Sequence, residues 1–230
     1  MATLEFTLPD GTTRPVTVTR VYNAGYAGRD QREVAAHIAE LAELGVPAPS
    51  HTPALYPIAP YLAGQPSTVP AQHDRTSGEG EWALLVGDDP GDPLLTVACD
   101  HTDRTLETHG VAWSKNAAPD VLGTAAWRLT DIADHLDAIT LRAWVRHGSE
   151  AEQLVQDASL AALLPPSYWL DVLRSRGWLQ PGTVLLSGTV SMLPGVDQFG
   201  DRWRVQLHDP ITNRTLECGY AVEQLPAPLG

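Results

Sequence analysis

The most constraining feature of this sequence is a pair of short apolar runs separated by a dense turn. The runs cover residues 82–86 (WALLV) and 94–99 (LLTVAC), and the sequence GDDPG lies between them at residues 87–91. Short apolar runs rich in strand formers and bounded by Gly, Asp and Pro are typical of buried β-strands. The sequence therefore predicts two strands joined by a turn.

Three carboxylates flank this predicted pair of strands. Glu79 and Glu81 precede the first run, and Asp100 follows the second. Side chains two residues apart on a strand share a face, so we expect the two glutamates to point the same way, with Asp100 beside them. Neighbouring carboxylates repel one another unless a cation lies between them, and oxygen donors favour Mg²⁺ or Mn²⁺ over zinc. The alternative is a solvated turn followed by a polar loop.

Charge and composition exclude several classes of partner. A net charge of −13 opposes binding to phosphate backbones, so we expect no nucleic acid partner. No apolar run approaches the ~18 to 20 residues that span a bilayer, and the start, MATLEFTLPDG, lacks a signal segment. These features predict one cytoplasmic domain that binds no membrane, with Cys99 and Cys218 as reduced thiols.

Other segments predict the elements around the central pair. Residues 4–22 alternate apolar and polar side chains around a Pro-Asp-Gly turn, which indicates an N-terminal hairpin or meander. Residues 31–44 predict an amphipathic helix that begins after Asp30 and ends at Gly45. We further predict a winding connection over 45–78, a helix over 127–137, strands over 139–146 and 183–186, and a hairpin formed by 203–207 and 215–218.

Four motifs occur in an informative order. They are Glu79-Gly80-Glu81, Asp100-His101-Thr102-Asp103-Arg104, Ser114-Lys115 and PGTVLLSGT over 181–189. In this order the chain resembles the fumarylacetoacetate hydrolase superfamily, and its nearest branch is the subgroup labelled DUF2848. The resemblance implies a β-rich α+β fold, a mixed-sheet β-roll of the fumarylacetoacetate hydrolase C-terminal-domain type. It also implies a homodimer, and a turn at 156–157 followed by a helix.

The resemblance further implies how the chain is organised. It predicts a single catalytic domain over 1–230, with N-terminal strands and a lid helix in 1–45 and the β-roll core in 46–230. On the predicted lid helix, His37 and Glu40 lie three residues apart and so share a face. By resemblance they form the acid–base pair that activates water, although a histidine on a helix is often structural or exposed.

The same resemblance implies a metal centre. Glu79, Glu81 and Asp100 would hold Mg²⁺, or alternatively Mn²⁺ or Ca²⁺. Lys115 would contact the substrate oxygens and stabilise negative charge that develops on them. Arg104 would organise the loop that carries the ligands. We expect Ser114 and Lys115 to be neighbours on a strand that point to opposite sides, so they do not form a nucleophile pair.

The expected substrate-binding residues are Arg29, Tyr56, Glu107, Gly188 and Thr189. Two positions depart from the family pattern. Glu107 stands where several relatives have glutamine, and the segment around Tyr56 lacks the lysine of its counterparts. Tyr56 is therefore either a pocket residue or a packed aromatic side chain.

These features together predict a function. The expected activity is metal-dependent hydrolysis of a carbon–carbon bond in a small β-dicarbonyl or 2-oxo acid such as an acylpyruvate. Decarboxylation and isomerisation pass through the same enolate, so a decarboxylase or isomerase is the first alternative. A binding protein that keeps the fold but lacks turnover is the second, and a biosynthetic enzyme with a bulky substrate is a third.

Overall fold

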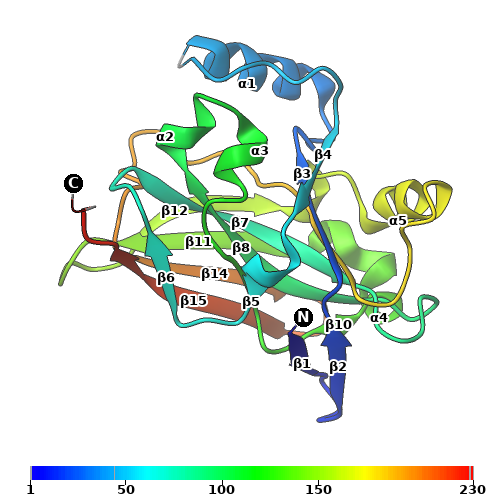
Figure 1. Ribbon diagram of the computed structural model, residues 1–230. Helices are drawn as coiled ribbons and strands as arrows, with labels where there is room; N and C mark the ends of the chain where they lie inside the picture. Colours follow the sequence, from blue (N-terminus) through cyan, green and yellow to red (C-terminus); the bar gives the residue numbers. More distant parts are fainter. Residues whose placement is uncertain (1, 44, 228, 230) are drawn as a thin grey trace.

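The computed structural model describes residues 2–43, 45–227 and 229, apart from the side chain of His37. Within these residues the strands form an eight-stranded sheet, a five-stranded sheet and a two-stranded hairpin (Figure 1). The two larger sheets pack face to face, and the hairpin covers one end of the outer face of the eight-stranded sheet.

The eight-stranded sheet contains the predicted central pair. Its strands follow the order β4-β3-β13-β7-β8-β9-β5, and β10 pairs with β8 beside this path. The β3–β13 and β5–β9 pairs are parallel and the others antiparallel, so the sheet is mixed. The bounds are β3 Arg20–Gly25, β4 Ala54–Ile58, β5 Ala63–Gly64, β7 Thr76–Leu85, β8 Leu94–Asp103, β9 Asp120–Leu122, β10 Trp127–Arg128 and β13 Thr183–Leu186.

The five-stranded sheet covers one face of the larger sheet. Its order is β12-β11-β14-β15-β6, and only the β15–β6 pair is parallel among the strands described. Along β11 and β14 every second residue is buried, as expected where one sheet face meets a core and the other meets water. The bounds are β6 Thr68–Ala71, β11 Thr140–Arg146, β12 Gln153–Ser159, β14 Arg202–Asp209 and β15 Arg214–Gln224.

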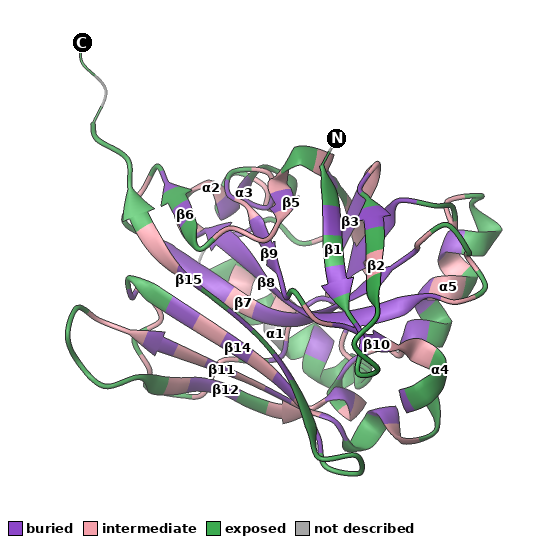
Figure 2. Ribbon diagram, turned by 90° about the horizontal axis from the view of Figure 1, so that it is seen from below, coloured by how far each residue is buried: buried purple, intermediate pink, exposed green. Residues whose placement is uncertain are grey.

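Two cores lie on opposite faces of the eight-stranded sheet. Trp82, Leu84 and Val97 belong to the core between the two larger sheets. The alternate residues Ala83 and Leu85 belong to a second core under the hairpin of β1 (Thr3–Thr7) and β2 (Thr13–Thr17). Strand β8 is therefore buried along its whole length, as Figure 2 shows.

The helices are short and lie at the edges of the sheets. Helix α1 begins after Asp30, whose Oδ1 accepts the Arg32 N–H at 2.8 Å. Of its apolar residues at helical spacing, Val34 is buried, Ile38 and Leu41 are half-buried, and Leu44 lies outside the described residues. The bounds are α1 Gln31–Glu43, α2 Arg104–Glu107, α3 Val111–Ser114, α4 Leu129–Ile132, α5 Pro166–Ser175, η1 Pro60–Leu62, η2 Ala133–Ala138 and η3 Leu160–Ala162. In Figure 1, α2 and α3 lie between the sheets and α1.

Much of the predicted architecture is confirmed. The β-rich α+β fold with mixed sheets is present, and so are the N-terminal hairpin, the strand at 183–186 and the terminal hairpin. Cys99 and Cys218 are free and buried. Among the described residues no helix has both the length and the apolar character needed to cross a bilayer.

Four local predictions are wrong. The connection over 45–78 contains strands β4, β5 and β6, which tertiary pairing stabilises despite many prolines and glycines. Residues 127–137 form β10, one turn of α4 and then η2, whose His135 has non-helical dihedrals. Residues 156–157 lie within β12 because they pair with β11. Ser114 ends helix α3 and Lys115 caps it, so neither residue lies on a strand.

Candidate metal centre

Four carboxylates occupy one face of the eight-stranded sheet. Glu79 on β7 lies directly opposite Asp100 on β8, which in turn lies directly opposite Asp120 on β9. Residues directly opposite one another on neighbouring strands point to the same face, and their Cβ atoms lie about 5 Å apart. Glu81 shares that face because it is two residues from Glu79. We call these four residues the carboxylate row.

Glycines between and beside the glutamates let the second sheet approach from the opposite face. The Gly80 N–H donates to Gln156 Oε1 at 2.8 Å, and a Cβ at Gly80 would lie 3.0 Å from that oxygen. A Cβ at Gly78 would lie 2.6 Å from the Trp203 ring. The Glu-Gly-Glu spacing therefore combines two carboxylates on one face with close packing on the other.

A buried lysine and a half-buried arginine contact the carboxylate row. Lys115 Nζ lies 3.1 Å from Glu79 Oε2 and also forms an ion pair with Asp100 Oδ2. Arg104 Nη2 lies 2.9 Å from Glu79 Oε1, and its Nη1 lies 3.0 Å from Glu107 Oε2. Both cations come from the segment after β8, which turns into α2 where Asp103 accepts two backbone N–H groups.

Several oxygens of the row have no partner in the part of the chain that the structure describes. Glu81 Oε2 accepts the Gly188 N–H at 2.8 Å, and Asn23 Nδ2 donates to Asp100 Oδ2 at 3.1 Å. Among the described residues, Glu81 Oε1, Asp100 Oδ1 and both oxygens of Asp120 have no hydrogen-bond partner. An unpaired buried carboxylate destabilises the folded protein, because its charge loses hydration.

This arrangement fits a divalent cation. Ligand oxygens from Glu79, Glu81 and Asp100 lie within 4.8 Å of one another. A hard cation such as Mg²⁺ binds carboxylate oxygens. It would supply positive charge to neutralise the oxygens that have no partner among the described residues. The structure thus brings the three predicted ligands together.

The pKa values reflect how unevenly the row is neutralised. Burial raises the pKa of Glu81 and of Asp120, and the negative charge of Asp100 raises both further. Burial alone would also raise the pKa of Glu79, but Lys115 and Arg104 outweigh it and hold that pKa well below its usual range. Burial favours a neutral Lys115, yet Asp100 and Glu79 raise its pKa well above the ordinary value, so it is an ammonium.

Gly188 and Thr189 lie beside β7, near the glutamate pair. Gly188 has φ of 77°, and a Cβ there would lie 2.9 Å from the carbonyl oxygen of Ala24, so the position favours glycine. Thr189 Oγ1 donates to the Gly80 carbonyl at 2.8 Å and accepts from Gln156 Nε2 at 2.7 Å. In this structure both residues make protein contacts, and their role in substrate binding stays a prediction.

Two tyrosines, Tyr56 and Tyr26, lie near Lys115. Tyr56 on β4 is half-buried, and burial raises its pKa while the nearby charge of Lys115 opposes the shift. Tyr26 adopts φ of 55°, which is rare for a bulky side chain. Burial, together with Tyr56 and Glu107, raises the pKa of Tyr26 to about 12, so its phenol stays protonated at neutral pH.

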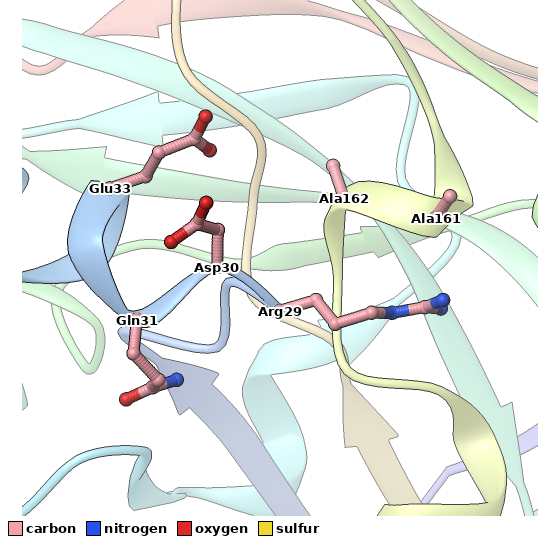
Figure 3. A pocket seen from close by; sticks show the side chains of 6 residues that line it. All are labelled: Arg29, Asp30, Gln31, Glu33, Ala161 and Ala162. Atoms are coloured by element: carbon pink, nitrogen blue, oxygen red, sulfur yellow. The ribbon is translucent and has the colours of Figure 1, made fainter.

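Arg29 makes a contact that sequence analysis did not anticipate. Its guanidinium forms two 2.8 Å hydrogen bonds with Asp137, and its Nε donates to the Leu163 carbonyl at 3.1 Å. In Figure 3 it extends beside the η3 segment that carries Ala161 and Ala162, in a hollow lined by none of the carboxylate row. The expected contact with substrate stays a prediction.

The predicted acid–base pair lies on α1. The side chain of His37 lies outside the described part of the structure, and Glu40 is exposed. The pairing of these two side chains at a reaction centre therefore stays a prediction.

Sequence analysis missed three residues of the site. Asp120 follows a proline and begins a short apolar run, Asp120-Val121-Leu122, which is a weak strand signal. Asn23 reaches Asp100 only because the parallel β3–β13 pairing brings distant segments together. Tyr26 had no distinguishing sequence signal, since its unusual dihedral is a tertiary property.

Comparisons with known proteins identify the family and the fold. A family model described as "Protein of unknown function (DUF2848)" matches residues 24–220. No curated protein matches the chain in sequence. A hexagonal crystal form of 2-keto-3-deoxyarabinonate dehydratase is similar in structure, with a TM-score of 0.67 and 17% identity over 93% of this chain and 77% of that one.

Two further structures are similar to a comparable degree. One is 2-keto-3-deoxy-D-arabinonate dehydratase complexed with magnesium and 2,5-dioxopentanoate, with a TM-score of 0.62 and 17% identity over 94% of this chain and 77% of that one. The other is Cg1458 with inhibitor, with a TM-score of 0.62 and 18% identity over 92% and 79% of the two chains. At this identity the likeness establishes the fold.

Proposed function

Because the chain belongs to the DUF2848 family and has the fumarylacetoacetate hydrolase fold, we propose that it is a divalent-metal-dependent enzyme acting on a small 2-oxo acid. The observation that supports this most strongly is the carboxylate row, in which buried oxygens that lack a partner among the described residues lie beside the ammonium of Lys115. Such a site suits a reaction in which negative charge develops on a substrate oxygen.

The residues of the site have distinct tasks in this proposal. Glu79, Glu81 and Asp100 would hold the ion, which when bound supplies a Lewis acid for the substrate oxygens. Lys115 donates a charged hydrogen bond to the oxygen on which enolate charge develops. Arg104 holds the Glu79 carboxylate from the side opposite Lys115 and so fixes its orientation.

Two uncharged side chains near Lys115, those of Tyr26 and Tyr56, would orient the substrate. Tyr26 and Tyr56 keep their protons at neutral pH and can donate hydrogen bonds to carbonyl or hydroxyl oxygens. Glu107 is paired with Arg104, so Arg104 is partly neutralised before any substrate enters. Lys115 is paired in a similar way with Glu79 and Asp100, and we assign it to the substrate oxygens because it matches the lysine of the family motif.

The specific reaction that we propose is hydrolytic cleavage of a carbon–carbon bond in an acylpyruvate-like acid. In it His37, oriented by Glu40, takes a proton from water, and the resulting hydroxide adds to the acyl carbonyl carbon. The carbon–carbon bond then breaks to give a carboxylic acid and the enolate of the 2-oxo acid, which Lys115 stabilises and which regains the proton from His37. Decarboxylation, isomerisation and loss of water from a 3-deoxy-2-oxo acid share that enolate. Loss of water is the stronger alternative, because solved structures of this fold include 2-keto-3-deoxy-D-arabinonate dehydratase.

A substrate panel tests the proposal. The protein would be assayed with acylpyruvates, oxaloacetate and 3-deoxy-2-oxo acids, with Mg²⁺ or Mn²⁺ and after exhaustive chelation. We expect turnover of at least one class, lost on chelation and restored by metal. Full turnover without metal would contradict the proposal, and tight binding of oxalate with no turnover of any compound would favour a ligand-binding protein.

A second comparison separates hydrolysis from the other reactions. We expect His37→Ala to abolish hydrolysis and to leave decarboxylation of oxaloacetate largely intact, because decarboxylation needs no activated water. Glu43→Ala, an exposed change on the same helix, is the matched control and should alter neither rate. Equal loss of both reactions in His37→Ala would exclude a role confined to water activation.

A further inference from the structure

Asp120 is the member of the carboxylate row that no ligand motif includes. It begins β9 directly opposite Asp100, and its side chain is completely buried. Because Glu79 lies opposite Asp100 on the other side, the three carboxylates form a continuous line across β7, β8 and β9. Asp120 therefore points to the same face of the sheet as the three expected ligands.

The surroundings of Asp120 compensate its charge only in part, through the nearby ammonium of Lys115. No described donor group gives a hydrogen bond to either carboxylate oxygen, and the group that can share a proton with Asp120 is the carboxylate of Asp100. The ammonium of Lys115 is directed at Glu79 and Asp100, and the guanidinium of Arg104 at Glu79 and Glu107. A buried carboxylate is normally paired or hydrogen-bonded, so the environment of Asp120 is incomplete without a further donor or cation.

We infer that Asp120 is a positioning residue of the cation site, one that accepts hydrogen bonds from water molecules bound to the ion. The inference rests on the proposed metal-dependent function. The ligand oxygens that lie within 4.8 Å of one another come from Glu79, Glu81 and Asp100, which places Asp120 one step farther out. Mg²⁺ and Mn²⁺ keep water ligands in sites with few protein carboxylates, and those waters need acceptors.

This role has a chemical consequence for the site. The unpartnered oxygens of Asp120, Glu81 and Asp100 together offer acceptors on adjacent strands for the ion and for its water ligands. An anion held at this position also strengthens binding of a divalent cation over a monovalent one, since the attraction scales with ionic charge. Asp120 would thus set the affinity of the site and the orientation of its water ligands.

Mn²⁺ binding to Asp120→Asn tests the inference without any assay of turnover. We expect the dissociation constant for Mn²⁺, measured by calorimetry, to increase about 10- to 100-fold, as for other residues that orient metal ligands. The electron paramagnetic resonance spectrum of bound Mn²⁺ should also change, because its water ligands lose an acceptor. The matched control is Asp209→Asn, which changes a buried aspartate on β14 and should leave both signals unaltered.

The outcomes are distinguishable. Folded Asp120→Asn protein that binds Mn²⁺ like the wild type, with an unchanged spectrum, would overturn the inference and leave the proposed function intact. Wild-type protein that binds no Mn²⁺ would overturn both. If Asp120→Asn does not fold, a crystal structure of the wild type with Mn²⁺ decides, with anomalous scattering to locate the ion. A metal-bound water within hydrogen-bond distance of Asp120 supports the inference, and its absence refutes it.

Discussion

The protein buries aspartates in two contrasting environments. Asp209, at the end of β14, accepts hydrogen bonds from the Ile211 N–H at 2.9 Å, from Thr212 Oγ1 at 2.6 Å and from His135 Nε2 at 3.0 Å. Asp120 is equally buried, yet both of its oxygens lack partners among the described residues. Burial is thus the same at the two positions, and the supply of donors differs.

The pKa shifts follow this difference in donors. Burial alone would raise the pKa of Asp209, but hydrogen bonds from Thr212 and His135 outweigh it and lower that pKa to about 2. At Asp120 burial and the neighbouring Asp100 act together, and the pKa is raised well above the ordinary value. A carboxylate whose oxygens already accept hydrogen bonds from the protein stabilises a turn. A carboxylate whose oxygens accept none is available to a ligand.

The largest effect on turnover is expected for Glu81→Gln, a change in the carboxylate row that also contains Asp120. The change removes a ligand charge and keeps the oxygen that accepts the Gly188 N–H, so the fold should persist. We expect turnover to fall at least about a thousandfold, because the cation contributes several kcal/mol to transition-state stabilisation. The melting temperature of the metal-free protein should stay equal or rise. A folded variant with wild-type turnover would show that the carboxylate row is structural.

The next largest effect is expected for Lys115→Met. Glu79 and Asp100 would lose their shared ammonium, and breaking a buried ion pair lowers the free energy of unfolding by about 3 to 5 kcal/mol. Urea denaturation with and without Mg²⁺ measures this loss, and the cation should restore part of it. If Mg²⁺ stabilises wild type and variant equally, the ion does not bind near Glu79 and Asp100.

A smaller effect on stability is expected at Asp209, the aspartate that the protein supplies with hydrogen bonds. Asp209→Asn keeps the shape of the side chain but removes its charge, and so weakens its hydrogen bonds to Thr212 and His135. We expect the free energy of unfolding to fall by about 1 to 3 kcal/mol, with Mn²⁺ affinity unchanged. Reduced Mn²⁺ affinity in this variant would mean that stability alone affects the cation site, and the contrast between the two aspartates would fail.

The smallest effect is expected in the pH dependence of the difference in unfolding free energy between wild type and Asp209→Asn. The folded pKa of Asp209, about 2, lies below its ordinary value of 3.8, so its charge stabilises the fold above about pH 4. This contribution should disappear as the pH falls from about 4 toward 2. Urea denaturation of wild type and Asp209→Asn at several pH values should give curves that converge in this window. Curves that stay parallel would show that Asp209 keeps its ordinary pKa.

Local sequence patterns were sufficient for the central strands and for three carboxylates. The turn between residues 82–86 and 94–99 forces the two runs to pair, and their antiparallel register places Glu79 opposite Asp100. Asp120 could not be found in this way, because β9 is a three-residue strand whose pairing with β8 depends on tertiary contacts. Parallel pairs such as β3–β13 join residues far apart in sequence and leave no local signal.

Local patterns also failed where packing overrides propensity. The Pro- and Gly-rich residues 45–78 supply strands because β3, β9 and β15 offer free edges to them. The segment at Lys115 is helical, so its ammonium approaches the sheet from α3. Family resemblance pointed to this lysine, whose role towards substrate stays a prediction, whereas its backbone conformation required the structure.

The glycines that flank Glu79 have a consequence for how this protein can vary. Trp203 and Val205 of the second sheet press against Gly78 and Gly80, directly behind the glutamates. A substitution that shifts the spacing of the two sheets by a few tenths of an ångström is transmitted to the positions of those carboxylates. Interior residues that lie behind the sheet can therefore alter the positions of the proposed metal ligands, and directed evolution of this scaffold can search its hydrophobic interior for changes in the proposed activity.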